Sequence, residues 1–106
     1  MSIKSRRKGV REELKLERFL QDHGFAAEKI SRAGYDGADL SVPILGIDRA
    51  VEVKVRAGGF KRIYEWLEAR DILVIRADRK EALVVVPLKL AVEIAARAEV
   101  RDGGPA

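Results

Sequence analysis

The sequence predicts an α/β fold in which helices flank a mixed β-sheet, with the elements in the order α-β-β-β-α-β-β-α. Three segments carry apolar residues at helical spacing, whereas apolar residues alternate or cluster in short runs in the segments between them. Glycines at positions 24, 46 and 58 separate these segments. The 106 residues, 47% of them hydrophobic, suit one domain with its own core, which we place at residues 9–101 before a frayed tail at residues 102–106.

The first helix is expected over residues 10–23, ended by Gly24 in the left-handed position just past a helix end. Its outward face carries the polar side chains of Arg11, Lys15, Arg18 and Asp22. Glu13 and Glu17 interrupt the apolar arc on the opposite face. A carboxylate directed toward a core is costly unless it is paired or bound to a metal, so both require a partner.

The next three elements are predicted to be strands. They cover residues 25–30, residues 38–42 after the turn at residues 34–37, and residues 49–56 after a hairpin turn marked by Pro43 and Gly46. In the last of them Val51, Val53 and Val55 share one face, and the charged residues between them share the other.

The second half of the chain repeats this alternation. A helix is expected over residues 60–70, strands over residues 72–76 and 83–86 around a turn at residues 78–81, and a final helix over residues 88–100. Both strands are more apolar than one buried face requires, which indicates burial on both faces or at an interface. Trp66 lies at the margin of the helical stripe and marks either a dimer surface or core packing.

Composition excludes several classes of protein. The absence of cysteine rules out disulfide scaffolds, thiolate zinc sites and cysteine nucleophiles, and the single histidine cannot supply a histidine-based metal nuclease. No apolar run approaches the roughly 18 residues of a membrane span, and no apolar region follows the charged N-terminus as in a signal peptide. We expect a cytoplasmic protein without a membrane partner, from a bacterial, archaeal or phage-infected cell.

The net charge of +4 is confined to the N-terminus. Residues 1–8 contain Lys4, Arg6, Arg7 and Lys8 and no acid, which leaves 17 basic and 17 acidic groups in residues 9–106. We interpret residues 1–8 as a flexible arm that contacts a polyanion such as DNA, with a solubilising tail as the alternative.

Acidic and basic residues recur at the middle strands. Asp39 opens one strand, and Glu52 and Lys54 share a face of its hairpin partner. Asp39 and Glu52 are suited to hold Mg²⁺, with Mn²⁺ as a substitute, because hard cations prefer oxygen ligands. Glu13 from the first helix completes this ligand set, and Lys54 is placed to orient or activate water or to stabilise charge on a phosphate. Taken singly, the strand pair also suits a solvated charged face, and Asp39 suits a turn.

Together these residues resemble a known group, the PD-(D/E)xK nuclease superfamily, and within it the archaeal-type Holliday junction resolvases that phages also encode. The resemblance covers residues 6–56. It rests on Lys8-Gly9 before Glu13, His23-Gly24-Phe25-Ala26, Ala33-Gly34, Asp39-Leu40 and Glu52-Val53-Lys54. It departs at Arg32, where those resolvases often carry serine, and in a shorter segment after the second strand pair.

The resemblance implies a restriction-endonuclease-like fold, metal ligands Glu13, Asp39 and Glu52, and Lys54 as the catalytic lysine. It implies a magnesium-dependent endonuclease that makes paired symmetric nicks in four-way DNA junctions during recombination and repair. A C2 homodimer matches the symmetry of such a junction. The basic residues expected to contact DNA are Arg6, Arg7, Lys8, Arg11, Arg32, Arg56, Lys61 and Arg62.

Two alternatives remain open from the sequence. One is a repair or restriction-type nuclease of the same superfamily acting on linear or single-stranded DNA. The other is a non-catalytic DNA-binding module of the same fold, which would bind DNA in a salt-sensitive manner and cleave none.

Overall fold

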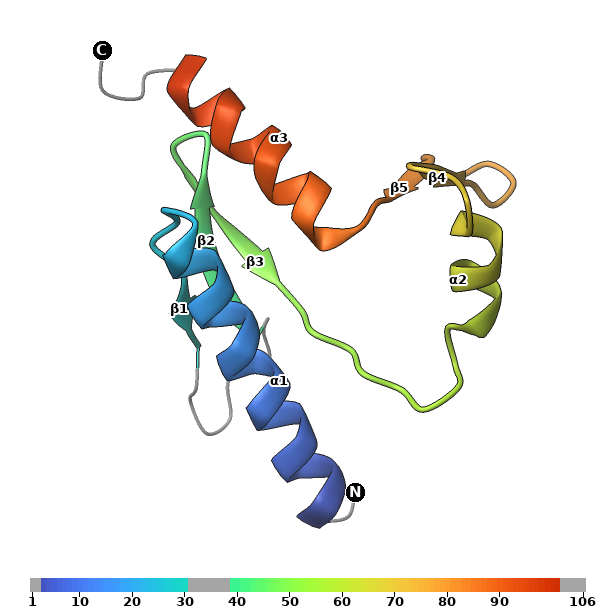
Figure 1. The fold of residues 1–106 in the computed structure, drawn as a ribbon, viewed down its shortest axis with the longest axis horizontal. Coiled ribbons are helices and arrows are strands. Elements are labelled where there is room, and N and C mark those ends of the chain that lie inside the picture. Colours follow the sequence, from blue (N-terminus) through green and yellow to red (C-terminus); the bar gives the residue numbers. More distant parts are fainter. Residues whose placement is uncertain (1–2, 31–38, 102–106) are drawn as a thin grey trace. The chain divides into compact units, whose positions relative to one another are not determined.

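A computed structural model describes residues 3–30 and 39–101 of the chain, with side chains from Lys8 onward (Figure 1). It contains three helices and five short strands in two antiparallel sheets, so the α/β class is confirmed. The elements are α1 (Ile3–Asp22), β1 (Glu28–Lys29), β2 (Leu40–Ile44), β3 (Ile47–Val51), α2 (Lys61–Leu67), β4 (Leu73–Ile75), β5 (Leu83–Val85) and α3 (Leu88–Arg101). The predicted turn at residues 34–37, Arg32 and the tail at residues 102–106 lie outside the described residues.

The chain divides into two compact units, where we expected one domain over residues 9–101. The first unit comprises Met1–Val55 with Ala95–Ala106, and the second comprises Arg56–Ile94. Residues 52–60, which span the boundary between Val55 and Arg56, contain no helix or strand and include the pair Gly58-Gly59 of the second unit. Two adjacent glycines leave the backbone with many accessible conformations, which suits a connection between units.

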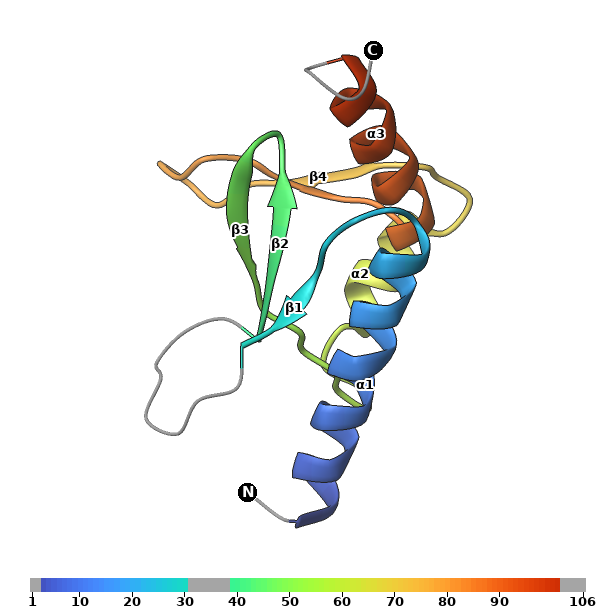
Figure 2. The ribbon, with the colours of Figure 1, turned by 90° about the vertical axis from the view of Figure 1, so that its left-hand side faces the viewer.

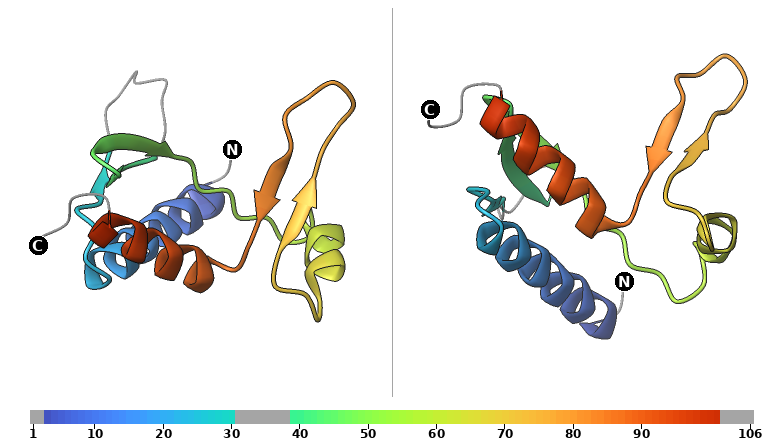
Figure 3. Two further views of the ribbon diagram at one scale, coloured as in Figure 1. Left: turned by 90° about the horizontal axis from the view of Figure 1, so that it is seen from above. Right: turned by 45° about the horizontal axis from the view of Figure 1, so that its top comes forward.

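The strands pair only antiparallel in the part of the chain that the structure describes, instead of forming the single mixed sheet that we expected. The first unit holds a three-stranded sheet in the order β1-β2-β3, and the second holds the pair β4-β5 (Figures 1 and 3). Short connections explain the pairs β2-β3 and β4-β5, because a tight turn returns a strand beside its predecessor, whereas parallel pairing needs a long crossover.

Helix α1 begins at Ile3, inside the segment that we expected to be a flexible arm, and ends close to the predicted boundary. Gly24 has φ +92°, and the amides of Gly24 and Phe25 donate to the carbonyls of Gln21 and Leu20, at 3.0 and 2.9 Å. These two bonds form a Schellman cap, and Leu20 and Phe25 are both buried beside it. The expectation that Gly24 adopts the left-handed position is confirmed.

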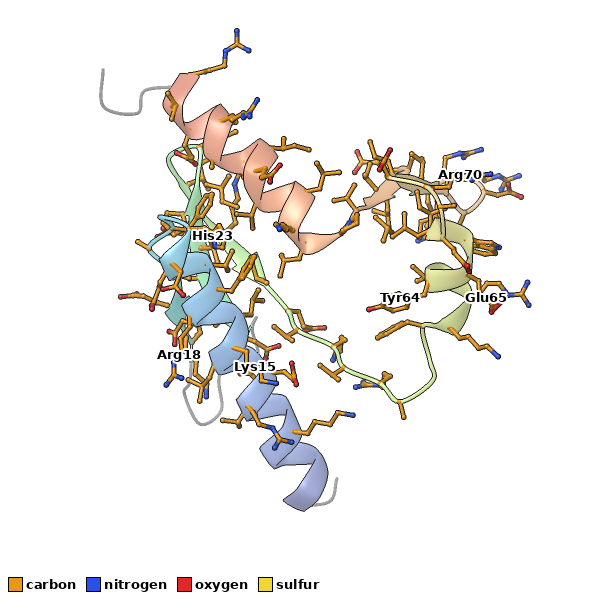
Figure 4. The ribbon with its side chains drawn as sticks, viewed as in Figure 1. Lys15, Arg18, His23, Tyr64, Glu65 and Arg70 are labelled. Carbon is orange, nitrogen blue, oxygen red and sulfur yellow. The ribbon has the colours of Figure 1, made fainter. Side chains whose placement is uncertain are left out.

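His23 belongs to the same helix terminus. Its Nδ1 lies 2.7 Å from the carbonyl oxygen of Phe19, and the two rings lie 4.3 Å apart between centroids (Figure 4). The ring satisfies a carbonyl that the end of the helix leaves without an intrahelical partner. The single histidine of the chain therefore has a structural position.

The hairpin between β2 and β3 has a two-residue turn. Leu45 and Gly46 have φ values of +54° and +75°, and Ile44 pairs with Ile47 on either side of them. Positive φ at both turn residues is typical of a type I′ turn, whose twist matches that of the flanking strands. Glu99 of α3 accepts a hydrogen bond from the backbone N–H of Leu45, which fastens the turn to the C-terminal half of α3 within the first unit.

The strand boundaries differ from the prediction around this hairpin. β2 and β3 are centred nearer the turn than residues 38–42 and 49–56, because the pairs extend from Leu40–Val51 to Ile44–Ile47. Pro43 lies within β2, beyond the two residues that pair with β1, so its missing N–H costs no bond to β1. β1 retains two of the six predicted residues, and the Schellman cap already engages Phe25.

The core of the first unit lies where α1 covers the three-stranded sheet (Figure 2). Leu20, Phe25, Ala27, Leu40 and Val42 are buried, and Leu40 and Val42 are almost completely inaccessible. The outward face of α1 is exposed as predicted: Arg11, Lys15, Arg18 and Asp22 all lie on the surface. The alternation in residues 51–56 is also confirmed, since the three valines are half-buried and Glu52, Lys54 and Arg56 are exposed.

The second unit exposes apolar side chains that we expected to be covered. Val74 and Val84 lie directly opposite each other in the β4-β5 pair, and both are more than half exposed. Trp66 is also more than half exposed, and the Arg62 guanidinium carbon lies 6.0 Å from its ring centroid. This cation–π contact gives the indole ring a partner within the chain, and the exposure of Trp66 argues against core packing, whereas a dimer surface at this position stays a prediction.

Charge is spread along the longest helix. α1 has 20 residues, and seven of its residues from Lys8 to Arg18 are charged. No helix in the described ranges is both long and apolar enough to cross a membrane.

The left-handed conformation of Leu45 predicts that a better turn residue stabilises the protein. Asparagine tolerates positive φ, and Asn-Gly is the preferred type I′ pair, so Leu45→Asn should raise the free energy of unfolding by about 1 kcal/mol. For a protein of this size that is about 4–8 °C in Tm, measured by circular dichroism. Gly46→Ala places a β-carbon at φ +75° and should lower Tm; a gain in Tm from this control would contradict the assignment of the turn.

Candidate active site

Asp39 lies where the three strands of the first unit meet. Its backbone N–H donates to the Val51 carbonyl at 2.9 Å, and its own carbonyl accepts from the Ile30 N–H, also at 2.9 Å. Its side-chain Oδ2 accepts a hydrogen bond of 2.7 Å from the backbone N–H of Val53. Asp39 is thus bonded to the segment following β1 and to the segment that β3 enters, and its carboxylate is held in a defined direction.

This arrangement accounts for the early end of β3. Beyond the Leu40–Val51 pair, the backbone of β2 no longer receives the next amide of the partner segment, and the Asp39 side chain receives it instead. Val53 stands between Glu52 and Lys54. The predicted proximity of Asp39 to the Glu52-Val53-Lys54 segment is therefore confirmed at the level of the backbone.

Glu52 and Lys54 pair with each other on the exposed face of that segment. Lys54 Nζ lies 3.3 Å from Glu52 Oε2, and both side chains are more than half exposed. An ion pair in solvent is worth at most about 1 kcal/mol, so either side chain can exchange this partner for another at little cost.

Glu13 is the carboxylate of α1 that responds to Asp39. Partial burial raises the pKa of the Glu13 carboxyl above its usual 4.5, and the negative charge of Asp39 raises it further. The positive charge of Lys29 acts in the opposite direction. Glu13 of α1 and Asp39, which precedes β2, therefore influence each other electrostatically.

Lys29 is a site residue that the sequence analysis missed. It is half-buried in β1, opposite the fully buried Leu40. The sequence contains a usable signal, because alternation along residues 27–29 places Lys29 on the same face as the apolar Ala27 and Glu28 on the other face. Its relation to Glu13 depends on how α1 crosses the sheet and is visible only in the folded chain.

Glu17, one turn after Glu13 in α1, has a structural partner. Its Oε2 accepts a hydrogen bond of 2.9 Å from the backbone N–H of Lys29. Glu17 therefore ties β1 to α1, and we assign it this role instead of that of a metal ligand. Both carboxylates that interrupt the apolar arc of α1 are half-buried, which confirms that they face the sheet.

The three predicted metal ligands are brought together in part. Glu13 and Asp39 act on each other, and Glu52 is one residue from the amide that Asp39 binds, but its carboxylate turns to Lys54. Among the residues that the structure describes, no group of three His, Asp or Glu side chains lies close enough to bind one metal ion. Two carboxylates fit Mg²⁺ nonetheless, because this ion is commonly held by one or two protein carboxylates and completes its shell with water and phosphate oxygens.

The predicted DNA-contacting residues lie in both units. In α1, Arg11 is exposed and Lys8 half-buried; Arg6 and Arg7 belong to its first turns. Arg56, Lys61 and Arg62 are exposed in the second unit, and Arg62 covers one face of Trp66.

Comparison of the chain with protein-family models, curated proteins and solved structures found no match.

The hydrogen bond from the Val53 N–H to Asp39 Oδ2 is expected to stabilise the folded protein. Asp39→Ala leaves a partly buried amide without its acceptor and should lower the free energy of unfolding by about 1–3 kcal/mol in urea titrations. Asp39→Asn keeps an acceptor oxygen and should retain most of that stability. Equal stability of the wild type and the alanine variant would contradict this role.

The raised pKa of Glu13 predicts a pH-dependent effect of Glu13→Gln on stability. Because the pKa of the folded chain is above 4.5, folding favours the protonated carboxyl; this contribution is complete below 4.5 and is lost as the pH rises through the folded-state pKa. Glutamine imitates the protonated form. Glu13→Gln should therefore raise Tm in EDTA at pH 7, and the gain should shrink as the pH falls below 4.5.

Glu28→Gln, which removes an exposed carboxylate on β1, is the matched control for this measurement. A gain of the same size and pH dependence in both variants would show that net charge, and not the surroundings of Glu13, is responsible.

Proposed function

We propose that this protein is a metal-dependent DNA endonuclease that hydrolyses phosphodiester bonds, with four-way junctions as its preferred substrate. The observation that carries the proposal is the position of Asp39. Its carboxylate is fixed by the amide between Glu52 and Lys54, and its negative charge raises the pKa of Glu13 in α1. Two carboxylates of separate elements beside an exposed lysine form a combination suited to phosphate chemistry with a divalent cation.

Glu13 and Asp39 would hold the metal, Mg²⁺ or Mn²⁺, with Glu52 joining when it leaves Lys54. Such a cation would supply positive charge that stabilises the negative charge developing on the phosphate oxygens, and it would lower the pKa of a water molecule bound to it. Asp39 enters this site with Oδ2 already bonded to Val53, so its direction is set before a ligand arrives. Such preorganisation reduces the reorganisation that the reaction requires.

Lys54 would act on the substrate phosphate. Its ammonium is exposed, its ion pair with Glu52 is weakly held, and Glu52 has a competing partner when a metal is present. If the Glu52 carboxylate binds the metal, its ion pair with Lys54 is broken. The Lys54 ammonium would then be able to contact the substrate phosphate.

Arg11 and Lys8 on α1 offer positive charge on the helix that carries Glu13. Phosphate contacts of this kind give affinity without sequence readout, which suits a nuclease that recognises the shape of a branched DNA. A C2 homodimer would present two sites with the symmetry of a four-way junction. The preference for four-way junctions rests on the resemblance of residues 6–56 to the junction resolvases.

The chemistry is tested by cleavage of a labelled four-way junction with Mg²⁺. Asp39→Asn and Lys54→Ala should each reduce the rate by about 100-fold or more while the affinity for DNA, measured in Ca²⁺, is kept. EDTA should abolish cleavage. Asp48→Asn, an exposed carboxylate change on β3 of the same unit, should cleave normally. Full activity of either site variant would refute the proposed residues.

The substrate is tested by comparing a junction, a flap, a linear duplex and a single strand at equal concentration. Paired symmetric nicks in the junction alone are the expected outcome. Cleavage of linear or single-stranded DNA would instead indicate a repair or restriction-type nuclease. Salt-sensitive binding with no cleavage in any divalent metal would indicate a DNA-binding module.

A further inference from the structure

Strand β1 places a lysine on the side of the sheet that α1 covers. Lys29 lies directly opposite Leu40 in the register of β1 and β2, and residues directly opposite each other in an antiparallel pair project from the same face. Leu40 is fully buried, so this face is the inner one. The hydrogen bond from the Lys29 N–H to Glu17 fixes the lysine backbone against α1.

Two carboxylates share these surroundings. Glu13 lies one helical turn before Glu17, and Asp39 immediately precedes Leu40. The Ile30 N–H, next to Lys29, donates to the Asp39 carbonyl at 2.9 Å, which holds the two backbones side by side. The charges of Asp39 and Lys29 shift the pKa of Glu13 in opposite directions. Together with Glu17, whose carboxylate accepts the Lys29 N–H, these groups form a local cluster of three carboxylates and one ammonium in which negative charge is in excess. Neighbouring carboxylates in a half-buried site repel each other, and a nearby cation offsets part of that cost.

We propose that Lys29 is the resident counter-cation of the Glu13–Asp39 carboxylate pair and that its positive charge limits how tightly this pair binds a divalent ion. The second clause rests on the proposed function, because that function assigns a metal to the pair. The first clause concerns the metal-free protein and stands independently. The same two carboxylates attract the ammonium and the divalent ion, and the two cations repel each other.

A purely structural role for Lys29 predicts the opposite result. The methylenes of a half-buried lysine cover apolar surface, and their loss would loosen the strand and weaken any site built on it. Loss of a counter-cation instead leaves the carboxylates with more negative charge. The metal-free protein then becomes less stable while the affinity for a divalent ion increases, and a loosened site does not bind metal more tightly.

The first clause is tested by a double-mutant cycle on the full chain in EDTA, with Tm measured at pH 7. Lys29→Met keeps the length and apolar stem of the side chain and removes its charge. Lys29→Met should lower Tm in the wild-type background. In the Glu13→Gln background, the same substitution should lower Tm by no more than half as much. Lys15→Met, a change of the same charge on the exposed face of α1, should have the same effect in both backgrounds. Equal losses for Lys29→Met in both backgrounds would overturn the proposal.

The second clause is tested by calorimetric titration of the full chain with Mn²⁺ in the absence of DNA. Lys29→Met should bind Mn²⁺ about fivefold or more tightly than the wild type, and Lys29→Arg, which keeps the charge, should match the wild type. Unchanged or weaker binding by Lys29→Met overturns this clause. If the wild type binds no Mn²⁺, or if Asp39→Asn binds Mn²⁺ as tightly as the wild type, both the proposed function and the second clause fail. The double-mutant cycle, which is measured without metal, still tests the first clause.

Discussion

The geometry of the first unit depends on the hydrogen bonds of one residue, Asp39. Its two backbone groups join it to Val51 and Ile30, and its carboxylate takes the amide of Val53 where the ladder between β2 and β3 ends. The side chain thus extends a three-stranded sheet with few paired residues, in a chain that has no disulfide to reinforce it. A charged acceptor makes a stronger hydrogen bond than a neutral one, which favours Asp at this position over the turn residues that otherwise resemble it.

The same constraint creates the electrostatic character of the site. The bond to Val53 holds the Asp39 carboxylate in place, and its negative charge raises the pKa of Glu13. Glu17, which also faces the sheet, is compensated by the Lys29 amide. Glu13 is compensated less completely, because Lys29 lowers its pKa while burial and Asp39 raise it, and the net result is a raised pKa. Local conflicts of this kind are commonly found at functional sites, and this position is where we propose that a cation binds.

Features that depend on a few neighbouring residues, such as the end of α1 and the exposure pattern of residues 51–56, were predicted well from the sequence. Gly24 ends α1 as expected because a Schellman cap needs only the few residues around the glycine. The alternation in residues 51–56 yields the expected exposed and half-buried faces, even though β3 ends at Val51, because a locally extended backbone is sufficient for it. Strand boundaries were predicted less well. The register of a hairpin is set by its turn, and Leu45, which is not a typical residue for positive φ, concealed the turn at Leu45-Gly46.

The sequence by itself determined the α/β class, the inward position of Glu13 and Glu17, and the association of Asp39 with the Glu52-Val53-Lys54 segment. These properties follow from periodicity and from a hairpin short enough to be recognised along the chain. Only the tertiary structure decided which inward carboxylate fastens β1 and which remains near Asp39, and that Lys29 lies among them. The physical reason is that contacts between a helix and a sheet depend on where the helix crosses, and this crossing is set by the packing of Leu20, Phe25 and Leu40 together, which no local pattern specifies.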